Sequence, residues 1–139
     1  MPGEGQLQQY GVIAYRRDNL DRLSILLITS RESRRWVVPR GNVMMSLSPA
    51  KAAAQEAWEE AGVIGLVSHQ PVGSYDYLKR RKDGSEVMAS VELYPLRVAE
   101  QKAEWPEKGQ RETRWFDQAE AAAVVEEPGL SILISGFAP

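Results

Sequence analysis

The sequence has no cysteine among its 139 residues, so disulfides, thiolate metal sites and cysteine nucleophiles are excluded. Its formal net charge is −2, and such a chain has no global basic field to hold duplex nucleic acid or an anionic membrane. No segment approaches the roughly 20 apolar residues that span a bilayer, and the first ten residues lack the basic start and apolar run of a secretory signal. We therefore expect a cytoplasmic protein without a membrane partner, in which any phosphate binding is local.

The residues that are present are those of a folded protein of ordinary size. Hydrophobic residues make up 43% of the chain and charged residues 26%, which is typical of a globular domain. A chain of this length buries one core, and no internal repeat, low-complexity segment or linker divides it. We expect a single domain over residues 1–139, with residues 1–5 disordered.

Segments rich in β-branched and aromatic residues alternate with turn signals and predict two hairpins. Asp83-Gly84 in the second hairpin is a strong tight-turn signal, because glycine accepts a positive φ angle. The basic run 79–82 beside that turn is expected to serve solubility. The predicted strands cover residues 10–16, 23–29, 36–38, 72–79, 86–98 and 111–116, and the predicted helices start near residues 49, 117 and 128. This order of strands and helices predicts an α+β domain with a mixed sheet.

The helix that carries most of the functional signal is predicted over residues 49–61. Ser48 is a favoured N-cap, Pro49 is a favoured first helical residue, and Gly62 supplies the left-handed position after the helix. At about 100° per residue, the helix has an apolar arc that should face the core and an opposite arc of acids. The apolar arc contains Ala50, Ala54, Ala57, Trp58 and Ala61, and the acidic arc contains Glu56, Glu59 and Glu60.

The three glutamates lie where a purely structural helix would avoid them. Residues three and four apart lie about 5 to 6 Å apart at Cβ, so Glu56 repels both Glu59 and Glu60. The helix dipole also disfavours anions at this end. A divalent cation would compensate, and carboxylate oxygens suit Mg²⁺ or Mn²⁺ better than zinc. Acids on an exposed helix face are often simply solvated, and spacing alone does not decide between these two interpretations.

The residues before the helix extend the pattern. Gly41 is followed after five residues by Leu47 and, after seven more, by the run Gln55-Glu56-Ala57-Trp58-Glu59-Glu60-Ala61-Gly62-Val63. This spacing resembles the signature of the MutT/Nudix hydrolases. The segment Trp36-Val37-Val38-Pro39-Arg40-Gly41 resembles the lead to that signature in the family, and the resemblance covers about residues 10–130. It implies the Nudix fold, a mixed β-sheet sandwiched between helices.

For activity, the resemblance implies a hydrolase that uses Mg²⁺ or Mn²⁺ to cleave a pyrophosphate linkage. The substrate would be a nucleoside diphosphate linked to another group, or a related phosphorylated small molecule. The metals would neutralise phosphate oxygens and lower the pKa of a bound water. Residues 30–39 and 104–116 look most like the branch that hydrolyses diphosphoinositol polyphosphates and diadenosine polyphosphates.

The resemblance also assigns roles to individual residues. Glu56, Glu59 and Glu60 would bind the divalent ions and act in catalysis, with Glu56 the first candidate to activate the attacking water. The backbone carbonyl of Gly41 would add a metal ligand. Many relatives supply a further carboxylate from a later loop, for which the candidates here are Glu107 and Glu112. Guanidinium groups fork onto phosphate oxygens, and the arginines expected to bind substrate are Arg31, Arg35, Arg40, Arg111 and Arg114.

Two positions depart from the family signature. Leu47 stands where the family has a glutamate, and Gln55 stands where it has an arginine. In the family these two are expected to form a structural salt bridge, and losing both together leaves no charge unpaired. The departures support one alternative, an inactive relative that binds a phosphorylated ligand without turnover. A second alternative is an RNA 5′-pyrophosphohydrolase, although the acidic chain has no obvious basic and aromatic stripe for RNA.

Overall fold

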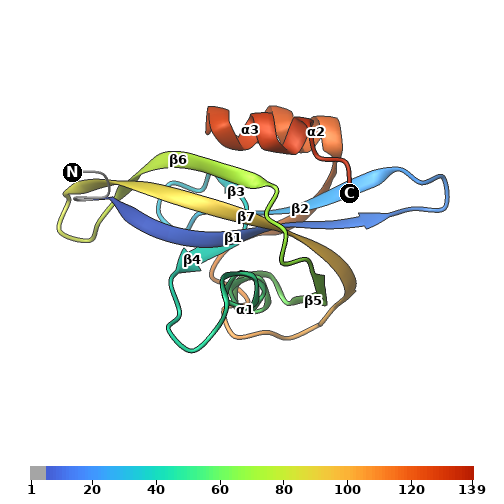
Figure 1. The fold of residues 1–139 in the computed structure, drawn as a ribbon, viewed down its shortest axis with the longest axis horizontal. Coiled ribbons are helices and arrows are strands. Elements are labelled where there is room, and N and C mark those ends of the chain that lie inside the picture. Colours follow the sequence, from blue (N-terminus) through green and yellow to red (C-terminus); the bar gives the residue numbers. More distant parts are fainter. Residues whose placement is uncertain (1–5) are drawn as a thin grey trace.

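The computed structural model describes residues 6–139, so the expected disorder of residues 1–5 lies outside the described residues. A mixed sheet runs through the molecule, with helix α1 (Pro49–Ala61) against one face and helices α2 (Gln118–Val124) and α3 (Pro128–Ser135) against the other (Figure 1). The predicted α+β fold, a mixed sheet between helices, is confirmed. Within the described residues the strands are β1 (Leu7–Arg17), β2 (Leu23–Thr29), β3 (Trp36–Val37), β4 (Arg40–Asn42), β5 (Val63–Val67), β6 (Gly73–Arg80), β7 (Glu86–Gln101) and β8 (Thr113–Asp117).

The centre of the sheet is a parallel pair between β1 and β7, in which Tyr10 lies opposite Glu92. Strands β4 and β2 pair antiparallel with successive parts of β1, and β6 and β5 do the same along β7. Strands β3 and β8 complete the sheet by pairing with β2. The two predicted hairpins are confirmed, and Gly84 in the second turn has a φ of 87°. Strands β4 and β5 were not predicted, because segments of three and five residues beside a helix show too little periodicity.

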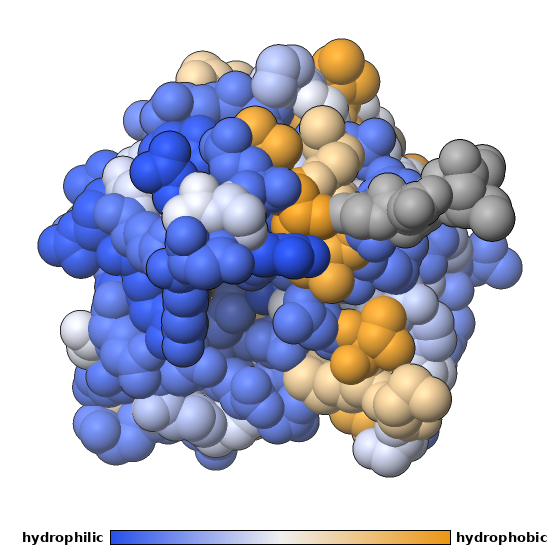
Figure 2. Space-filling model, turned by 90° about the vertical axis from the view of Figure 1, so that its left-hand side faces the viewer, coloured by the Kyte–Doolittle hydropathy of each residue, from blue (hydrophilic) through white to orange (hydrophobic). Residues whose placement is uncertain are grey.

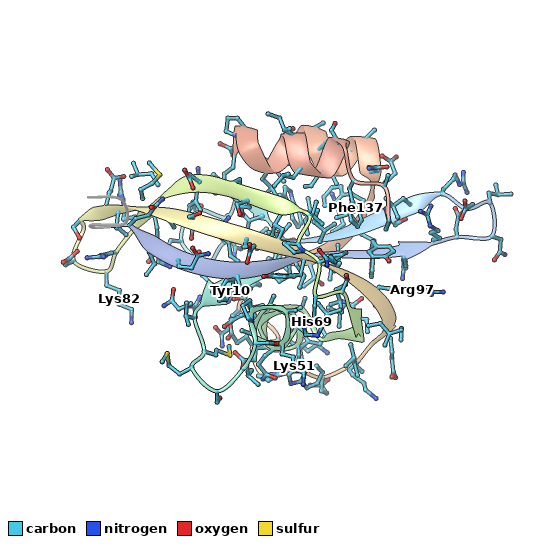
Figure 3. All side chains as sticks on the ribbon, in the orientation of Figure 1. Tyr10, Lys51, His69, Lys82, Arg97 and Phe137 are labelled. Atoms are coloured by element: carbon cyan, nitrogen blue, oxygen red, sulfur yellow. The ribbon has the colours of Figure 1, made fainter. Side chains whose placement is uncertain are left out.

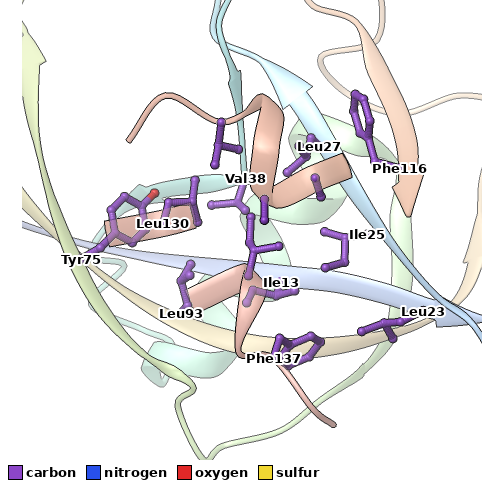
Figure 4. Packing of buried hydrophobic residues seen from close by; sticks show 14 of the residues in the cluster. Ile13, Leu23, Ile25, Leu27, Val38, Tyr75, Leu93, Phe116, Leu130 and Phe137 are labelled. Carbon is purple, nitrogen blue, oxygen red and sulfur yellow. The ribbon is translucent and has the colours of Figure 1, made fainter. Parts of the chain in front are cut away.

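Two apolar clusters fill the spaces on either side of the sheet. The first lies between the sheet and helices α2 and α3, and it includes Ile13, Leu93 and Leu130 (Figure 4). The second lies between the sheet and α1, where the helix contributes only alanines. Figure 3 shows Tyr10 on the α1 side and Phe137 on the side of α2 and α3. No helix within residues 6–139 is long and apolar enough to span a membrane.

The face that α1 turns to the sheet differs from the predicted one. Ala53 and Ala57 are fully buried and Glu60 is only 8% exposed, whereas Trp58 is half-buried and lies in neither cluster. The prediction that Trp58 shares the core arc is therefore wrong. Because alanine side chains are small, the helix packs close to the sheet along the arc that contains them. That orientation brings Glu60 inward, next to β4.

Candidate active site

The caps of α1 fix the position of its acids. Ser48 Oγ accepts a hydrogen bond from the backbone N–H of Lys51, and Pro49 occupies the first turn. At the other end Gly62 has a φ of 73°, and its N–H donates to the carbonyl oxygen of Trp58. The predicted helix bounds and both predicted caps are confirmed. The final turns, which carry the three glutamates, lie beside β4.

Strand β4 approaches these acids so closely that a glycine is required. A Cβ atom added at Gly41 would lie 2.2 to 2.5 Å from the carboxyl atoms of Glu56, which is well inside van der Waals contact. The neighbouring backbone N–H of Arg40 donates to Oε1 of Glu60 across 3.2 Å. The edge of β4 thus meets two of the three carboxyls at one place.

The surroundings of Glu56 and Glu60 favour their protonated forms. Burial, followed by the charge of Glu59, raises the pKa of Glu56 to about 7. Burial also raises the pKa of Glu60 to about 8; the nearby Arg111 guanidinium opposes this rise and the charge of Glu56 adds to it. The charge of Glu107 raises both pKa values further. A hydrogen bond with Glu60 lowers the pKa of Glu56 in part, but the neighbouring negative charges raise both pKa values, and a cation would offset those charges.

The donor set fits a hard divalent ion. Mg²⁺ and Mn²⁺ prefer oxygen ligands, and the adjacent carboxyls of Glu56 and Glu60 supply them. Among residues 6–139, no three acidic or histidine side chains converge tightly enough to surround an ion as they stand. The Glu59 carboxylate is held by another partner, since its Oε2 accepts a hydrogen bond of 2.8 Å from Gln55 Nε2. Glu56 and Glu60 would therefore hold the ion, with Glu59 beside them.

Stability measured without metal tests this electrostatic conflict. Folded-state pKa values above the usual 4.5 mean that the folded protein binds more protons than the unfolded chain between about pH 4.5 and 8. The stabilising contribution of the pair is present below this window and is lost as the pH rises through it. We expect the free energy of unfolding in EDTA to fall by about 1 to 3 kcal/mol between pH 6 and pH 8.

Chemical denaturation of wild type and variants checks this expectation. Glu60→Gln should flatten the pH dependence, and Mg²⁺ should restore most of the stability lost by wild type at pH 8. Glu100→Gln is the matched control, because Glu100 is an exposed acid that pairs with Lys102 away from the cluster. A pH dependence that is equally steep in Glu60→Gln and wild type would show that the raised pKa does not govern stability.

The loop between β7 and β8 adds two residues to the acid cluster. The backbone N–H of Glu107 donates to the carbonyl oxygen of Glu59 at 3.0 Å, and its carboxylate pairs with Arg111. The Arg111 side chain is 7% exposed, and its Nε has no hydrogen-bond partner within the part of the chain that the structure describes. Glu112, the other predicted candidate, is exposed and uses its backbone N–H to bond Thr29 Oγ1. Of the two candidates for the further carboxylate of the site, the geometry therefore favours Glu107 over Glu112.

A cavity of about 780 Å³ opens beside Glu60. Figure 2 shows a recess at this end of the molecule among mostly hydrophilic side chains. Four of the five arginines expected to bind substrate line the cavity: Arg31, Arg35, Arg40 and Arg111. Arg114 is not among the lining residues, and its guanidinium lies over the Trp36 ring, 5.7 Å from the centroid.

Arg40 lines the cavity, but its guanidinium is already engaged inside the protein. It donates to both carboxylate oxygens of Glu127, at 2.8 and 3.3 Å, and to the hydroxyl of Tyr75 at 2.7 Å. It also lies 3.7 Å from the centroid of the Tyr77 ring. The side chains of Arg40 and Glu127 are only 11% and 7% exposed. The structure thus gives Arg40 a buried ion pair in place of an open phosphate contact.

The second hairpin contributes lining residues that the sequence pattern missed. Lys79 and Arg80 line the cavity together with Tyr77, so the expectation that the basic run serves solubility needs correction for its first two residues. Consecutive basic residues were the available signal. What could not be seen was that β6 lies across from the loop at residues 30–35, because that proximity depends on how the sheet assembles.

Comparison with known proteins places the chain in a family. The model of the NUDIX domain matches residues 7–133, which is most of the chain. The chain belongs to the Nudix family. The predicted family is therefore confirmed, and the Nudix signature spans the same elements, from Gly41 on β4 to the end of α1, that meet at the acid cluster.

Two Nudix relatives illustrate the similarity in sequence. Nudix hydrolase 17, mitochondrial, of Arabidopsis thaliana is 32% identical over 124 residues, which cover 85% of this chain and 66% of the relative. Diphosphoinositol polyphosphate phosphohydrolase 3-beta of Bos taurus is 29% identical over 125 residues, covering 88% of this chain and 71% of the relative. The chain spans 66%, 52% and 53% of the length of three of the Arabidopsis Nudix hydrolases that it matches.

Solved structures show the same fold at low identity. The Ap4A hydrolase of C. elegans has a TM-score of 0.64 and 17% identity, and the match covers 92% of each chain. The dihydroneopterin triphosphate pyrophosphohydrolase of E. coli has a TM-score of 0.68 and 16% identity, covering 94% of this chain and 93% of the other. These likenesses establish the Nudix fold alone.

The two departures from the Nudix signature now have structural positions. Leu47 is 37% exposed and lies in a loop with other exposed apolar side chains, of which Met45 is 95% exposed. Gln55, at the arginine position, donates directly to the signature glutamate Glu59. The Gln55 amide therefore holds the Glu59 carboxylate in place. The apolar Leu47 side chain forms no corresponding polar contact.

Proposed function

We propose that this chain hydrolyses a pyrophosphate linkage in a polyphosphorylated small molecule, in a reaction that depends on Mg²⁺ or Mn²⁺. The observation that carries the proposal is that Glu56 and Glu60 meet at the edge of β4, and that Glu60 lines a cavity whose walls also carry cationic side chains. Carboxylates gather divalent ions, and guanidinium groups gather phosphate oxygens. A substrate bound between them would present its anhydride bond to the acids. Nudix membership supports the same chemistry.

Each residue of the site has a distinct part in this reaction. A bound divalent ion would neutralise phosphate oxygens and lower the pKa of the attacking water. Glu56 and Glu60 would hold the ion, and Glu56 is the first candidate to accept the proton of that water. Arg111 is buried beside Glu60, and its Nε–H, which has no partner among residues 6–139, would donate to a phosphate oxygen. Gln55 would keep the Glu59 carboxylate ready next to the ion.

The cavity walls favour a substrate with several phosphoryl groups. Besides Arg40 and Arg111, which are already paired with glutamates, the walls carry the cationic side chains of Arg31, Arg35, Lys79 and Arg80, against two acids beyond Glu60, Glu32 and Glu86. Tyr77 is the only aromatic residue among the described lining residues, and the Arg40 guanidinium covers one face of its ring. Recognition through phosphate groups is therefore better supported than recognition through a stacked nucleobase. A diphosphoinositol polyphosphate, the compound class in the name of the bovine relative, is the first candidate, and diadenosine polyphosphates are the second.

A substrate panel tests the proposed function. Release of phosphate and nucleotide would be measured with Mg²⁺, with Mn²⁺ and with EDTA, on diphosphoinositol polyphosphates, diadenosine polyphosphates, ADP-ribose, nucleoside triphosphates and capped RNA. We expect metal-dependent turnover that is fastest on a compound with several clustered phosphates. Turnover that persists in EDTA, or that is unaffected by Glu60→Gln, would contradict the proposed site.

A second candidate function is a Nudix-fold module that binds a phosphorylated ligand without turning it over. The replacement of the signature glutamate and arginine by Leu47 and Gln55 is the observation that favours it. No hydrolysis across the panel, combined with ligand binding measured by calorimetry, would support this function. Leu47→Glu combined with Gln55→Arg would then be the variant expected to gain turnover.

A further inference from the structure

The geometry points to Glu127, at the start of α3, as a positioning residue for the acid cluster that acts through Arg40; this inference rests on the proposed function. Glu127 and Glu60 lie on different elements and are linked by one residue. The Arg40 side chain pairs with Glu127, while the Arg40 backbone N–H donates to Glu60. Arg40 therefore connects the helix layer on one side of the sheet with the acids on the other.

Glu127 makes contacts that suit holding Arg40 better than capping a helix. It stands at the N-cap position of α3, yet its side chain makes no capping hydrogen bond. Its two carboxylate oxygens instead accept from the two terminal nitrogens of Arg40, at 2.8 and 3.3 Å. A planar guanidinium bound in this forked manner is fixed in orientation as well as in position. The Tyr75 hydroxyl and the Tyr77 ring enclose it further.

Strand β4 lies at an edge, and among the described strands it pairs only with β1. The strand has three residues and pairs with β1, where Gly11 lies opposite Arg40. A Cβ at Gly11 would lie 2.7 Å from the Pro39 carbonyl oxygen, so the two strands are in close contact there. That contact sets the distance of β4 from β1. The contacts of the Arg40 guanidinium with Glu127, Tyr75 and Tyr77 form a clamp, the Arg40 clamp. It is placed to set the tilt of β4, and with it the direction of the N–H that bonds Glu60.

A double-mutant cycle with Mn²⁺ affinity as the readout tests the clamp. Arg40→Met, Glu127→Leu and the combined variant would be titrated with Mn²⁺ while free Mn²⁺ is followed by electron paramagnetic resonance. Arg40→Met keeps the backbone N–H that donates to Glu60, so any loss of Mn²⁺ affinity comes from removal of the guanidinium that orients it. We expect each single variant to bind Mn²⁺ about tenfold more weakly, as is usual for groups that orient a metal ligand. The combined variant should also lose about tenfold, because both substitutions break the same clamp.

The combined variant shows whether a loss of Mn²⁺ affinity comes from lost positioning of the acids or from a less stable fold. Removing one member of a buried ion pair leaves an uncompensated charge, whereas replacing both members with apolar residues is often neutral for stability. We expect the unfolding temperature of the combined variant to return close to that of wild type while its Mn²⁺ affinity stays low. If the single variants do not fold, the combined variant alone carries the test. Wild-type Mn²⁺ affinity in the combined variant would overturn the inference.

A control in α3 excludes a general loosening of the helix. Ser131 Oγ donates to the carbonyl oxygen of Ala122 at 2.7 Å and joins α3 to α2 without touching Arg40. Ser131→Ala should keep wild-type Mn²⁺ affinity, and an equal loss in this variant would overturn the role of Glu127. The amide resonance of Arg40 gives a second readout, because a change in its hydrogen bond to Glu60 should shift it in Glu127→Leu and leave it unchanged in Ser131→Ala.

Glu60→Gln distinguishes failure of this inference from failure of the proposed function. If wild type binds no Mn²⁺, or if Glu60→Gln binds it as wild type does, the proposed metal site itself is wrong. If Glu60→Gln loses Mn²⁺ while the clamp variants bind it normally, the proposed function stands and Glu127 has no positioning role.

Discussion

Glu60→Gln is expected to lower turnover with Mg²⁺ more than about a hundredfold while the protein stays folded. Glu60 is 8% exposed and accepts the Arg40 backbone N–H, a bond that an amide oxygen can keep. What the amide cannot supply is the negative charge that attracts a divalent ion. Outer groups that merely orient a metal ligand are worth about 10- to 100-fold, so loss of a ligand should exceed that range. Glu59→Gln should act in the same direction.

Steady-state kinetics and far-ultraviolet circular dichroism would check this result together. Glu100→Gln is the control, since it removes an acid of the same kind from an exposed position. The variant without the Glu60 charge should also be more stable than wild type in EDTA at pH 8, because burial and the Glu56 charge raise the Glu60 pKa. Full activity in both Glu59→Gln and Glu60→Gln would exclude this acid cluster as the active site.

Gly41→Ala is expected to lower turnover about a hundredfold with little change in stability. The new methyl group would overlap the Glu56 carboxyl, whose atoms lie 2.2 to 2.5 Å from the position of an added Cβ. The carboxyl is the far end of a flexible side chain, so it can move aside and the fold survives. A displacement of about 1 Å in a catalytic group can reduce the rate about a hundredfold. The substitution therefore tests whether turnover depends on where the Glu56 carboxyl lies, because the carboxyl itself is still present.

Gly136→Ala is the matched control for this substitution. A Cβ there would lie 3.6 Å from the Ile132 carbonyl oxygen, an ordinary contact far from the acids. Turnover and Mn²⁺ affinity should be unchanged in Gly136→Ala and reduced in Gly41→Ala, with both unfolding temperatures close to wild type. Normal turnover in Gly41→Ala would mean that the placement of Glu56 against β4 is not needed for the reaction.

The parts of the fold that could be predicted are those encoded by neighbouring residues. The bounds of α1 follow from Ser48, Pro49 and Gly62, each of which acts within one helical turn. The hairpin turn at Gly84 follows from a single dipeptide. The orientation of α1 was beyond such reasoning, because Ala53 and Ala54 are equally apolar and the sheet decides which of them is covered. Burial of Glu60 depends on that choice.

The candidate site shows the same division. Gly41 and the glutamates could be placed together from the family spacing, but the reason for the glycine, its contact with Glu56, required the structure. The partner of Arg40 lies 87 positions away and leaves no trace in any local pattern. The sequence likewise does not show that Arg111 lines the cavity whereas Arg114, three positions later in the same segment, lies over the Trp36 ring.

The parallel pairing of β1 with β7 sets the order in which the site can form during folding. Leu7 pairs with Ala89, so the central pair of the sheet must wait until most of the chain is available. Partners this distant have to close a long loop before any contact compensates the lost entropy, which slows folding into the range of milliseconds to seconds. The caps of helix α1 act within one turn at each end, but a helix of 13 residues gains most of its stability from packing against the sheet. On a ribosome the acidic helix would emerge well before the central strand pair that completes its binding site.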